Sequence, residues 1–213
     1  MLKVVGIGPG SRDYITAAAI KAIKGAKTLV GSKRQLESFE DVDCAKILLG
    51  FGSDCKDVFT SGDGMVVLAS GEPGLYGILD LVLKYVPAEF VEVIPGISSV
   101  QYMMAKLKLP MKDAVVVSLH GRDGKVAYKV KDHSTVIVLT DKNRGPIYIA
   151  KALIKSHIRE VDIYVGENLS YDDEIINKYA PEELAKSKNH FGMNVVVIKK
   201  CINMTTESPM HYL

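Results

Sequence analysis

Short apolar runs alternate with longer amphipathic stretches along the first half of the chain. Residues 2–7 and 65–69 are almost wholly apolar, which predicts strands that are buried on both faces. Residues 13–25 carry their apolar positions at helical spacing. This alternation is typical of βαβ units and predicts a mostly parallel sheet. The other elements expected here are strands at 28–30 and 90–94, helices at 33–38, 75–85 and 97–107, and an irregular stretch over 40–64 that contains a further helix.

The same pattern resumes after Pro110, which ends the preceding helix because a residue before proline is pushed out of helical geometry. Strands are expected at 114–119, 135–140, 161–165 and 195–199, with a helix at 146–156. Residues 170–179 fit either a strand or a helix. We therefore predict an α/β fold with two consecutive α/β domains, residues 1–111 and 112–213.

Composition and charge exclude several classes of protein. The chain is 47% hydrophobic and 24% charged, as in ordinary globular proteins. A net charge of +2 gives no reason to expect nucleic acid as a partner. No apolar run approaches the roughly 18–20 residues of a membrane span, and a strand that begins at residue 2 leaves no room for a signal peptide. Three cysteines without a CxxC pair indicate neither a metal site nor a disulfide framework. We expect a cytoplasmic protein.

The first glycine-rich turn, GIGPG at residues 6–10, follows the first strand. Glycine there permits positive φ and a close approach of the backbone to a ligand. A nicotinamide dinucleotide site would need GxGxxG and an acidic residue about 20 positions further on. The second strand instead ends in VGSKR at 30–34, without a carboxylate. Nicotinamide binding is therefore disfavoured, and a purely structural tight turn stays open.

Two further turns of this kind follow later strands, SGEPGLYG at residues 70–77 and PGISS at 95–99. Glu72 suits the ribose or amino group of a cofactor, or it is simply an acid at a helix N-terminus. Ser98 and Ser99 can cap the next helix. Because the carboxyl ends of parallel strands share one edge of a sheet, the three turns together predict a ligand site at that edge.

Basic residues and one histidine supply the remaining candidate chemistry. SLHGR at residues 118–122 ends a strand, and its arginine can bind a carboxylate through the guanidinium fork. Two other pairs, Lys33 with Arg34 and Lys142 with Arg144, either face a site or are solvated charge. No nucleophile elbow, HExxH, Walker lysine or pair of carboxylates is present. We therefore expect chemistry through a reactive cofactor and positioning, with neither a protein nucleophile nor a protein-bound metal.

The turns VGIGPG, SGEPGLYG and PGISS, in this order and followed by IYVGENL at 163–169, resemble the tetrapyrrole methylase family. Its members are S-adenosylmethionine-dependent enzymes of corrin and sirohaem synthesis. The string PGISSVQ joined to LPxxDAVVVSLHGR is similar to the C5-methyltransferase branch, which acts on cobalt-precorrin-7. The resemblance implies two α/β domains with the cofactor in the cleft between them, usually in a homodimer. The positions that match cofactor contacts are Pro9, Ser70, Gly71, Glu72, Ser98, Ser99, Thr140 and Leu169. Glu72 stands where aspartate is usual, and Thr140 where several relatives have methionine.

The resemblance further implies methyl transfer to C5 of cobalt-precorrin-7, with S-adenosylhomocysteine as the product and the cobalt as part of the substrate. Residues expected near the carboxylates of the ring are Arg12, Lys33, Arg34, His120 and Arg122. Bifunctional relatives carry a second domain that methylates C15 and removes a carboxyl group, so we expect a separate partner enzyme for that step. Three alternatives remain: diphthine synthase, a nicotinamide-dependent reductase, and a non-catalytic binding module.

Overall fold

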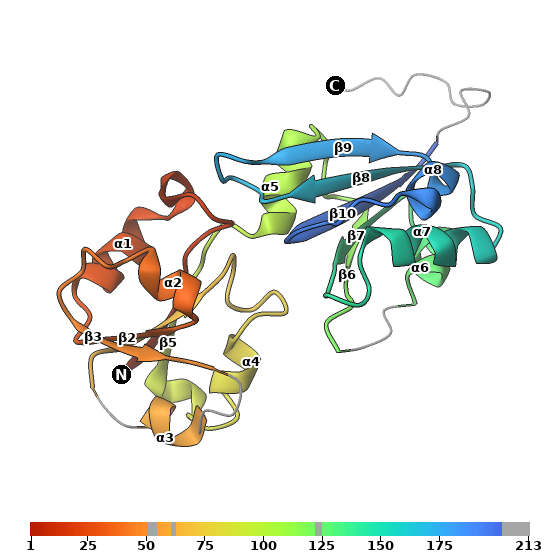
Figure 1. Ribbon diagram of the computed structural model, residues 1–213. Helices are drawn as coiled ribbons and strands as arrows, with labels where there is room; N and C mark the ends of the chain where they lie inside the picture. The colour runs from red at the N-terminus through yellow and green to blue at the C-terminus, as the bar shows by residue number, and fades with distance from the viewer. Residues whose placement is uncertain (51–54, 61–62, 122–124, 202–213) are drawn as a thin grey trace, which may run out of the picture. The chain divides into compact units, whose positions relative to one another are not determined.

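The computed structural model describes residues 1–50, 55–60, 63–121 and 125–201 (Figure 1). Contacts within the chain define two compact units. The first consists of residues 1–108 together with 169–173, and the second of 109–168 and 174–213. The two α/β units confirm the expected fold class. The return of residues 169–173 to the first unit is a feature that the sequence pattern did not indicate.

The first unit is built on a fully parallel five-stranded sheet in the order β3-β2-β4-β1-β5. The strands are β1 (Leu2–Gly6), β2 (Thr28–Gly31), β3 (Ala45–Leu48), β4 (Met65–Ala69) and β5 (Val91–Ile94). All five residues of β4 are buried, as expected for a central strand of a sheet that is covered on both faces. The carboxyl ends of the strands therefore share one edge.

Helices cover both faces of this sheet because neighbouring residues of a strand point to opposite sides. Val5 packs on one face with α1 (Ala17–Lys24) and α2 (Lys33–Glu37), whereas Val4 packs on the other with α3 (Cys55–Thr60) and α4 (Leu79–Val82). The unit also contains α5 (Ser99–Lys106) and the 3-10 turns η1 (Arg12–Tyr14) and η2 (Ala88–Phe90).

Three expectations for the first unit need correction. The helix expected over 13–25 begins only at Ala17, because Thr16 caps it by accepting a hydrogen bond from the Ala19 amide. The helix expected over 75–85 shortens to α4, and Tyr76 just before it adopts a left-handed φ of 54°. The irregular stretch over 40–64 contains a strand, β3, which was not expected. It is a short edge strand with three exposed residues, so its sequence lacks a buried apolar run.

The second unit also has a five-stranded sheet, in the order β6-β7-β10-β8-β9. Its strands are β6 (Ala114–Ser118), β7 (Thr135–Leu139), β8 (Val161–Glu167), β9 (Ile175–Tyr179) and β10 (Asn194–Lys200). Only β6 and β7 pair in parallel among these strands, so the prediction of a mostly parallel sheet was wrong for this half. The connection from β8 to β9 is too short for a crossover helix, and a short connection favours antiparallel pairing.

The helices of the second unit pack on one continuous core with strands β6, β7, β8 and β10. They are α6 (Val126–Asp132), α7 (Pro146–Lys155) and α8 (Pro181–Lys186). The sequence pattern indicated α7 but neither α6 nor α8, and it left β9 undecided. Within the described residues, no helix is long and apolar enough to cross a membrane.

Candidate functional site

The three glycine-rich turns meet at the carboxyl edge of the first sheet, after β1, β4 and β5. Gly71 donates its amide hydrogen to the Gly8 carbonyl oxygen at 2.8 Å, and the Gly8 amide donates back to Gly71 at 3.4 Å. A Cβ atom on Gly6 would lie 2.5 Å from the Gly96 nitrogen and 2.7 Å from the Gly71 oxygen. The backbones of the three turns therefore touch directly, which only glycine allows here.

This cluster lies at a switch in the topology of the sheet. The chain leaves β2 toward β3 on one side, and it leaves the neighbouring strand β4, which carries the second turn, toward β5 on the other. Ligands of open α/β sheets bind where such connections diverge. Gly8 and Gly71 adopt φ values of 78° and 69°, so both turns depend on a backbone conformation that favours glycine.

The polar side chains of the cluster are engaged in local hydrogen bonds. The Glu72 carboxylate accepts from the Gly74 amide at 2.8 Å. The buried Ser98 hydroxyl accepts from the Gln101 amide at 3.1 Å and so caps α5, and Ser99 begins the same helix, half-buried. The alternative interpretations of Glu72 and Ser98 as turn and cap residues thus have direct structural support, and their cofactor roles stay predictions.

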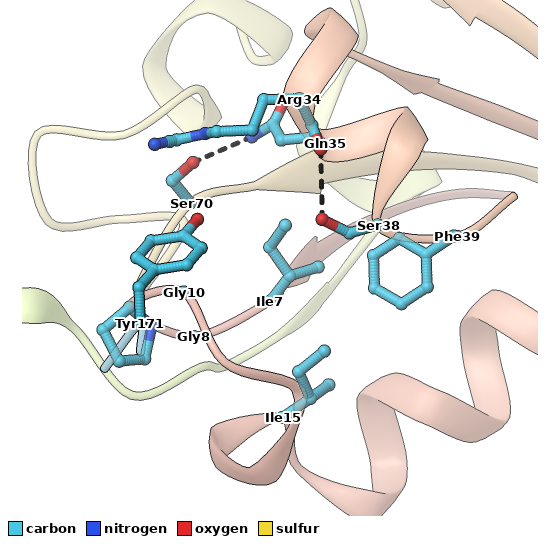
Figure 2. A pocket seen from close by; sticks show the side chains of 11 residues that line it. Ile7, Gly8, Gly10, Ile15, Arg34, Gln35, Ser38, Phe39, Ser70 and Tyr171 are labelled. Carbon is cyan, nitrogen blue, oxygen red and sulfur yellow. Dashed lines mark hydrogen bonds between the residues drawn. The ribbon is translucent and has the colours of Figure 1, made fainter. Parts of the chain in front are cut away.

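A shallow pocket opens beside the first turn, between the turn and α2 (Figure 2). Its water-accessible volume is about 20 Å³, and it is open to solvent. Its lining residues are Ile7, Gly8, Pro9, Gly10, Ile15, Arg34, Gln35, Ser38, Phe39, Ser70 and Tyr171. Pro9, Ser70 and Arg34 were candidate site residues from the sequence, and the structure brings these three to the same pocket.

One wall of the pocket comes from far along the chain, from residues 169–173. The Ser11 amide donates to the Ser170 hydroxyl at 2.8 Å. A Cβ atom on Gly10 would lie 2.7 Å from Cζ of Tyr171, so the tyrosine ring packs closely against the glycine turn. Leu169, a predicted cofactor contact, is buried in the same segment. Sequence reasoning missed Tyr171, and the glycine at position 10 was the available signal that something packs closely there.

The other basic candidates of the first unit are held in ion pairs at the surface. The Arg12 guanidinium contacts both carboxylate oxygens of Asp41, at 3.0 and 3.1 Å, and lies over the Phe39 ring. This hydrogen bond from Arg12 holds the pKa of the Asp41 carboxyl below its usual value. Lys33 is exposed, and its Nζ lies 3.8 Å from a carboxylate oxygen of Glu37, one turn along α2.

Candidates in the second unit lie at the ends of β6 and β7. The buried Thr140 hydroxyl lies 3.1 Å from the carbonyl oxygen of Asn194 and 2.9 Å from its side-chain Oδ1. His120 is exposed, and its amide donates to the Ser118 hydroxyl at 3.3 Å. Arg122 lies outside the described residues. In the part of the chain that the structure describes, no group of His, Cys, Asp and Glu residues could hold a metal ion.

Comparison with known proteins assigns the chain to a family. The family model described as Tetrapyrrole (Corrin/Porphyrin) Methylases matches residues 1–185, and the chain belongs to this family. It is 37% identical over 202 residues to the cobalt-precorrin-7 C(5)-methyltransferase of Salmonella typhimurium, covering 93% of this chain and 98% of that protein. It is 36% identical over 196 residues to the probable cobalt-precorrin-7 C(5)-methyltransferase of Methanocaldococcus jannaschii. That match covers 87% of this chain and 92% of the relative.

The fold is also found in a solved structure, the precorrin-6Y methylase of cobalamin biosynthesis from Archaeoglobus fulgidus. The TM-score is 0.71 at 23% identity, over 95% of this chain and 99% of that one. This likeness supports the two-unit α/β architecture independently of the sequence motifs.

Proposed function

We propose that the protein transfers the methyl group of S-adenosylmethionine to C5 of cobalt-precorrin-7, a step of cobalamin biosynthesis. The observation that carries this proposal is the identity of 36–37%, over most of both chains, to two relatives that bear this name. The string PGISSVQ and LPxxDAVVVSLHGR supports the same branch of the family.

The glycine cluster fits a cofactor of this chemistry. Gly6, Gly71 and Gly96 bring the backbones of the three turns into direct contact, and the same turns carry the hydroxyl groups of Ser70, Ser98 and Ser99 and the carboxylate of Glu72. An ionised carboxylate has about four acceptor positions, so the bond to Gly74 leaves Glu72 able to bind an amino or ribose group. We assign cofactor binding in the first unit to Pro9, Ser70, Gly71, Glu72, Ser98, Ser99 and Leu169. When bound, S-adenosylmethionine supplies an electrophilic methyl group on its sulfonium sulfur.

The contribution of the chain is positioning. The meso carbon of the reduced ring is enamine-like and is itself the nucleophile, so no side chain has to form a covalent intermediate. Holding two reactants in line can be worth on the order of 7–11 kcal/mol in favourable model systems. The ring carries many carboxylates, and we assign their binding to Arg12, Lys33, Arg34, His120 and Arg122, since guanidinium, ammonium and imidazole N–H groups donate hydrogen bonds to carboxylates.

The decisive experiment incubates the purified protein with isotopically labelled methyl donor and cobalt-precorrin-7. We expect the mass of the ring to rise by one labelled methyl group, which NMR maps to C5. Label at another carbon, or methylation of elongation factor in place of the ring, would contradict the proposal. Binding of S-adenosylhomocysteine without turnover on any tetrapyrrole would favour the non-catalytic binding module.

We further propose a homodimer that works with a separate enzyme for C15 methylation and decarboxylation in the cytoplasm. Light scattering coupled to gel filtration measures the mass of the assembly in solution. Pull-down experiments with the candidate C15 enzyme, with and without the corrinoid, measure whether the two proteins associate stably.

A further inference from the structure

The pocket beside the first glycine turn has two chemically different parts (Figure 2). Ile7 and Ile15 form an apolar floor, and the Phe39 ring behind them is fully buried. The polar side chains that line the pocket are those of Arg34, Gln35, Ser38, Ser70 and Tyr171. A short alkyl chain that ends in a carboxylate matches this division, because its methylene groups can cover the floor while the carboxylate meets the guanidinium and the other donors.

The donors opposite the floor are fixed before any ligand binds. The Gln35 side-chain oxygen accepts from the Ser32 amide at 2.7 Å, which directs its Nε2 to the Ser70 hydroxyl oxygen at 3.0 Å. A serine hydroxyl that accepts a hydrogen bond still has its own proton to donate. Preorganised donors of this kind lose little freedom when they bind an anion.

Tyr171 faces these donors from the opposite wall. Its ring is held against Gly10, and the hydrogen bond from the Ser11 amide to Ser170 fixes the neighbouring backbone. In Figure 2 the tyrosine hydroxyl is directed toward Ser70, on the same side as Arg34. The pocket thus places a hydroxyl donor and a guanidinium on two sides of one small space.

We propose that this pocket binds one carboxylate side chain of the substrate ring, with Arg34 as the counter-ion and Tyr171 as a residue that selects and positions that side chain. The identity of the ring rests on the proposed function. The water-accessible volume of about 20 Å³, open to solvent on one side, has room for the terminal group of one acetate or propionate side chain and not for the macrocycle.

The test uses a stable corrin polycarboxylate, dicyanocobyrinic acid, and its neutral methyl ester, with binding followed by difference absorbance. Arg34→Gln removes the positive charge. Arg34→Lys keeps the charge but loses the two parallel N–H groups with which a guanidinium binds a carboxylate. Tyr171→Phe keeps the ring on Gly10 and loses the hydroxyl. Lys21→Gln, on the exposed side of α1, and Tyr148→Phe, on α7, are matched controls.

We expect Arg34→Gln to weaken binding of the acid by about 10- to 100-fold, as for loss of a charge-assisted hydrogen bond, and Tyr171→Phe by about 2- to 10-fold. Arg34→Lys should fall between wild type and Arg34→Gln. Neither Arg34→Gln nor Tyr171→Phe should change binding of the ester, and a merely structural role would affect acid and ester alike. Affinity for S-adenosylhomocysteine, measured by calorimetry, should stay within about twofold of wild type, and both controls should bind like wild type.

Equal affinity of wild type and Arg34→Gln for the acid would overturn the proposal, as would a loss of S-adenosylhomocysteine binding of the same size. In methyl transfer to cobalt-precorrin-7, the Arg34→Gln change should appear in KM more than in kcat. If the wild-type protein does not methylate that ring, the proposed function is wrong. The comparison of acid with ester would still show whether the pocket binds a carboxylate side chain.

Discussion

Gly8 and Gly71 join the first two glycine turns by hydrogen bonds in both directions, and each adopts a left-handed φ. An alanine in that backbone conformation lowers the stability of the folded state by roughly 1–2 kcal/mol. At position 71 its Cβ would also press against Cα of Ser98, at 3.3 Å. We therefore expect Gly71→Ala to lower the free energy of unfolding by at least about 1–2 kcal/mol and to weaken S-adenosylhomocysteine binding.

Gly64→Ala is the matched control for this change. Gly64 also has a left-handed φ, of 77°, but its neighbour is the flexible side chain of Lys27, which can move. Urea unfolding should show a similar backbone penalty for both variants, whereas calorimetry should show normal ligand affinity for Gly64→Ala. Unchanged affinity in Gly71→Ala would remove the second turn from the proposed cofactor site.

Gly6→Ala tests the close approach of the three turns. The new Cβ would meet backbone atoms of Gly96 and Gly71 at 2.5 and 2.7 Å, and backbone cannot give way as a side-chain end can. Overpacking of this kind costs typically 1–3 kcal/mol and at times more. The control, Gly25→Ala, makes only ordinary contact with the Lys21 oxygen at 3.5 Å and should change stability by less than about 0.5 kcal/mol. Equal unfolding midpoints for the two variants would contradict the packing described here.

The ion pair between Arg12 and Asp41 should make the stability of the fold depend on pH. The pKa of the Asp41 carboxyl is lowered, first by the hydrogen bond from Arg12. A carboxyl with a lowered pKa in the folded state stabilises the fold above its usual pKa of about 4, and this stabilisation is lost as the pH falls through the lowered value. NMR titration should show Asp41 ionising below ordinary aspartates in wild type, and near them in Arg12→Gln. A titration of Asp41 that Arg12→Gln leaves unchanged would disprove the assigned cause.

The Thr140 hydroxyl links β7 to β10 in the second unit through Asn194. Thr140→Val keeps the shape of the side chain but leaves part-buried oxygen atoms of Asn194 with one partner fewer. We expect a loss of about 1–2 kcal/mol in the free energy of unfolding, and near-wild-type stability for Thr140→Ser, which retains the hydroxyl. Thermal or urea unfolding distinguishes the two variants. A stable Thr140→Val protein would mean that water replaces the lost bond.

Much of the first unit could be predicted from the sequence because its central strands are continuous apolar runs. Residues 65–69 were expected as a strand and form β4 with the same bounds. The meeting of the glycine turns also followed, since parallel strands present their carboxyl ends at one edge. The edge strands β3 and β9 gave no such signal, because most of their residues are exposed.

The strand pairing of the second sheet depends on contacts between distant parts of the chain. So does the wall of the pocket that residues 169–173 supply. Nothing local to β10 indicates that it inserts between β7 and β8. Gln35 and Tyr171 reach the same pocket only because the chain returns to the first unit after β8. The helix α6 did carry a local signal, with Val126 and Val130 buried at a spacing of four residues, but basic residues around them obscured it.

The return of residues 169–173 has a consequence for how such proteins can recombine. These residues connect β8 to β9 but pack with the unit that precedes them in the chain, so no single crossover point separates the two halves cleanly. A chimera joined near residue 111 inherits Arg34 from one parent and Tyr171 from the other. Its preference among ring substituents would then follow the loop between β8 and β9 as much as the half of the gene that encodes the glycine turns.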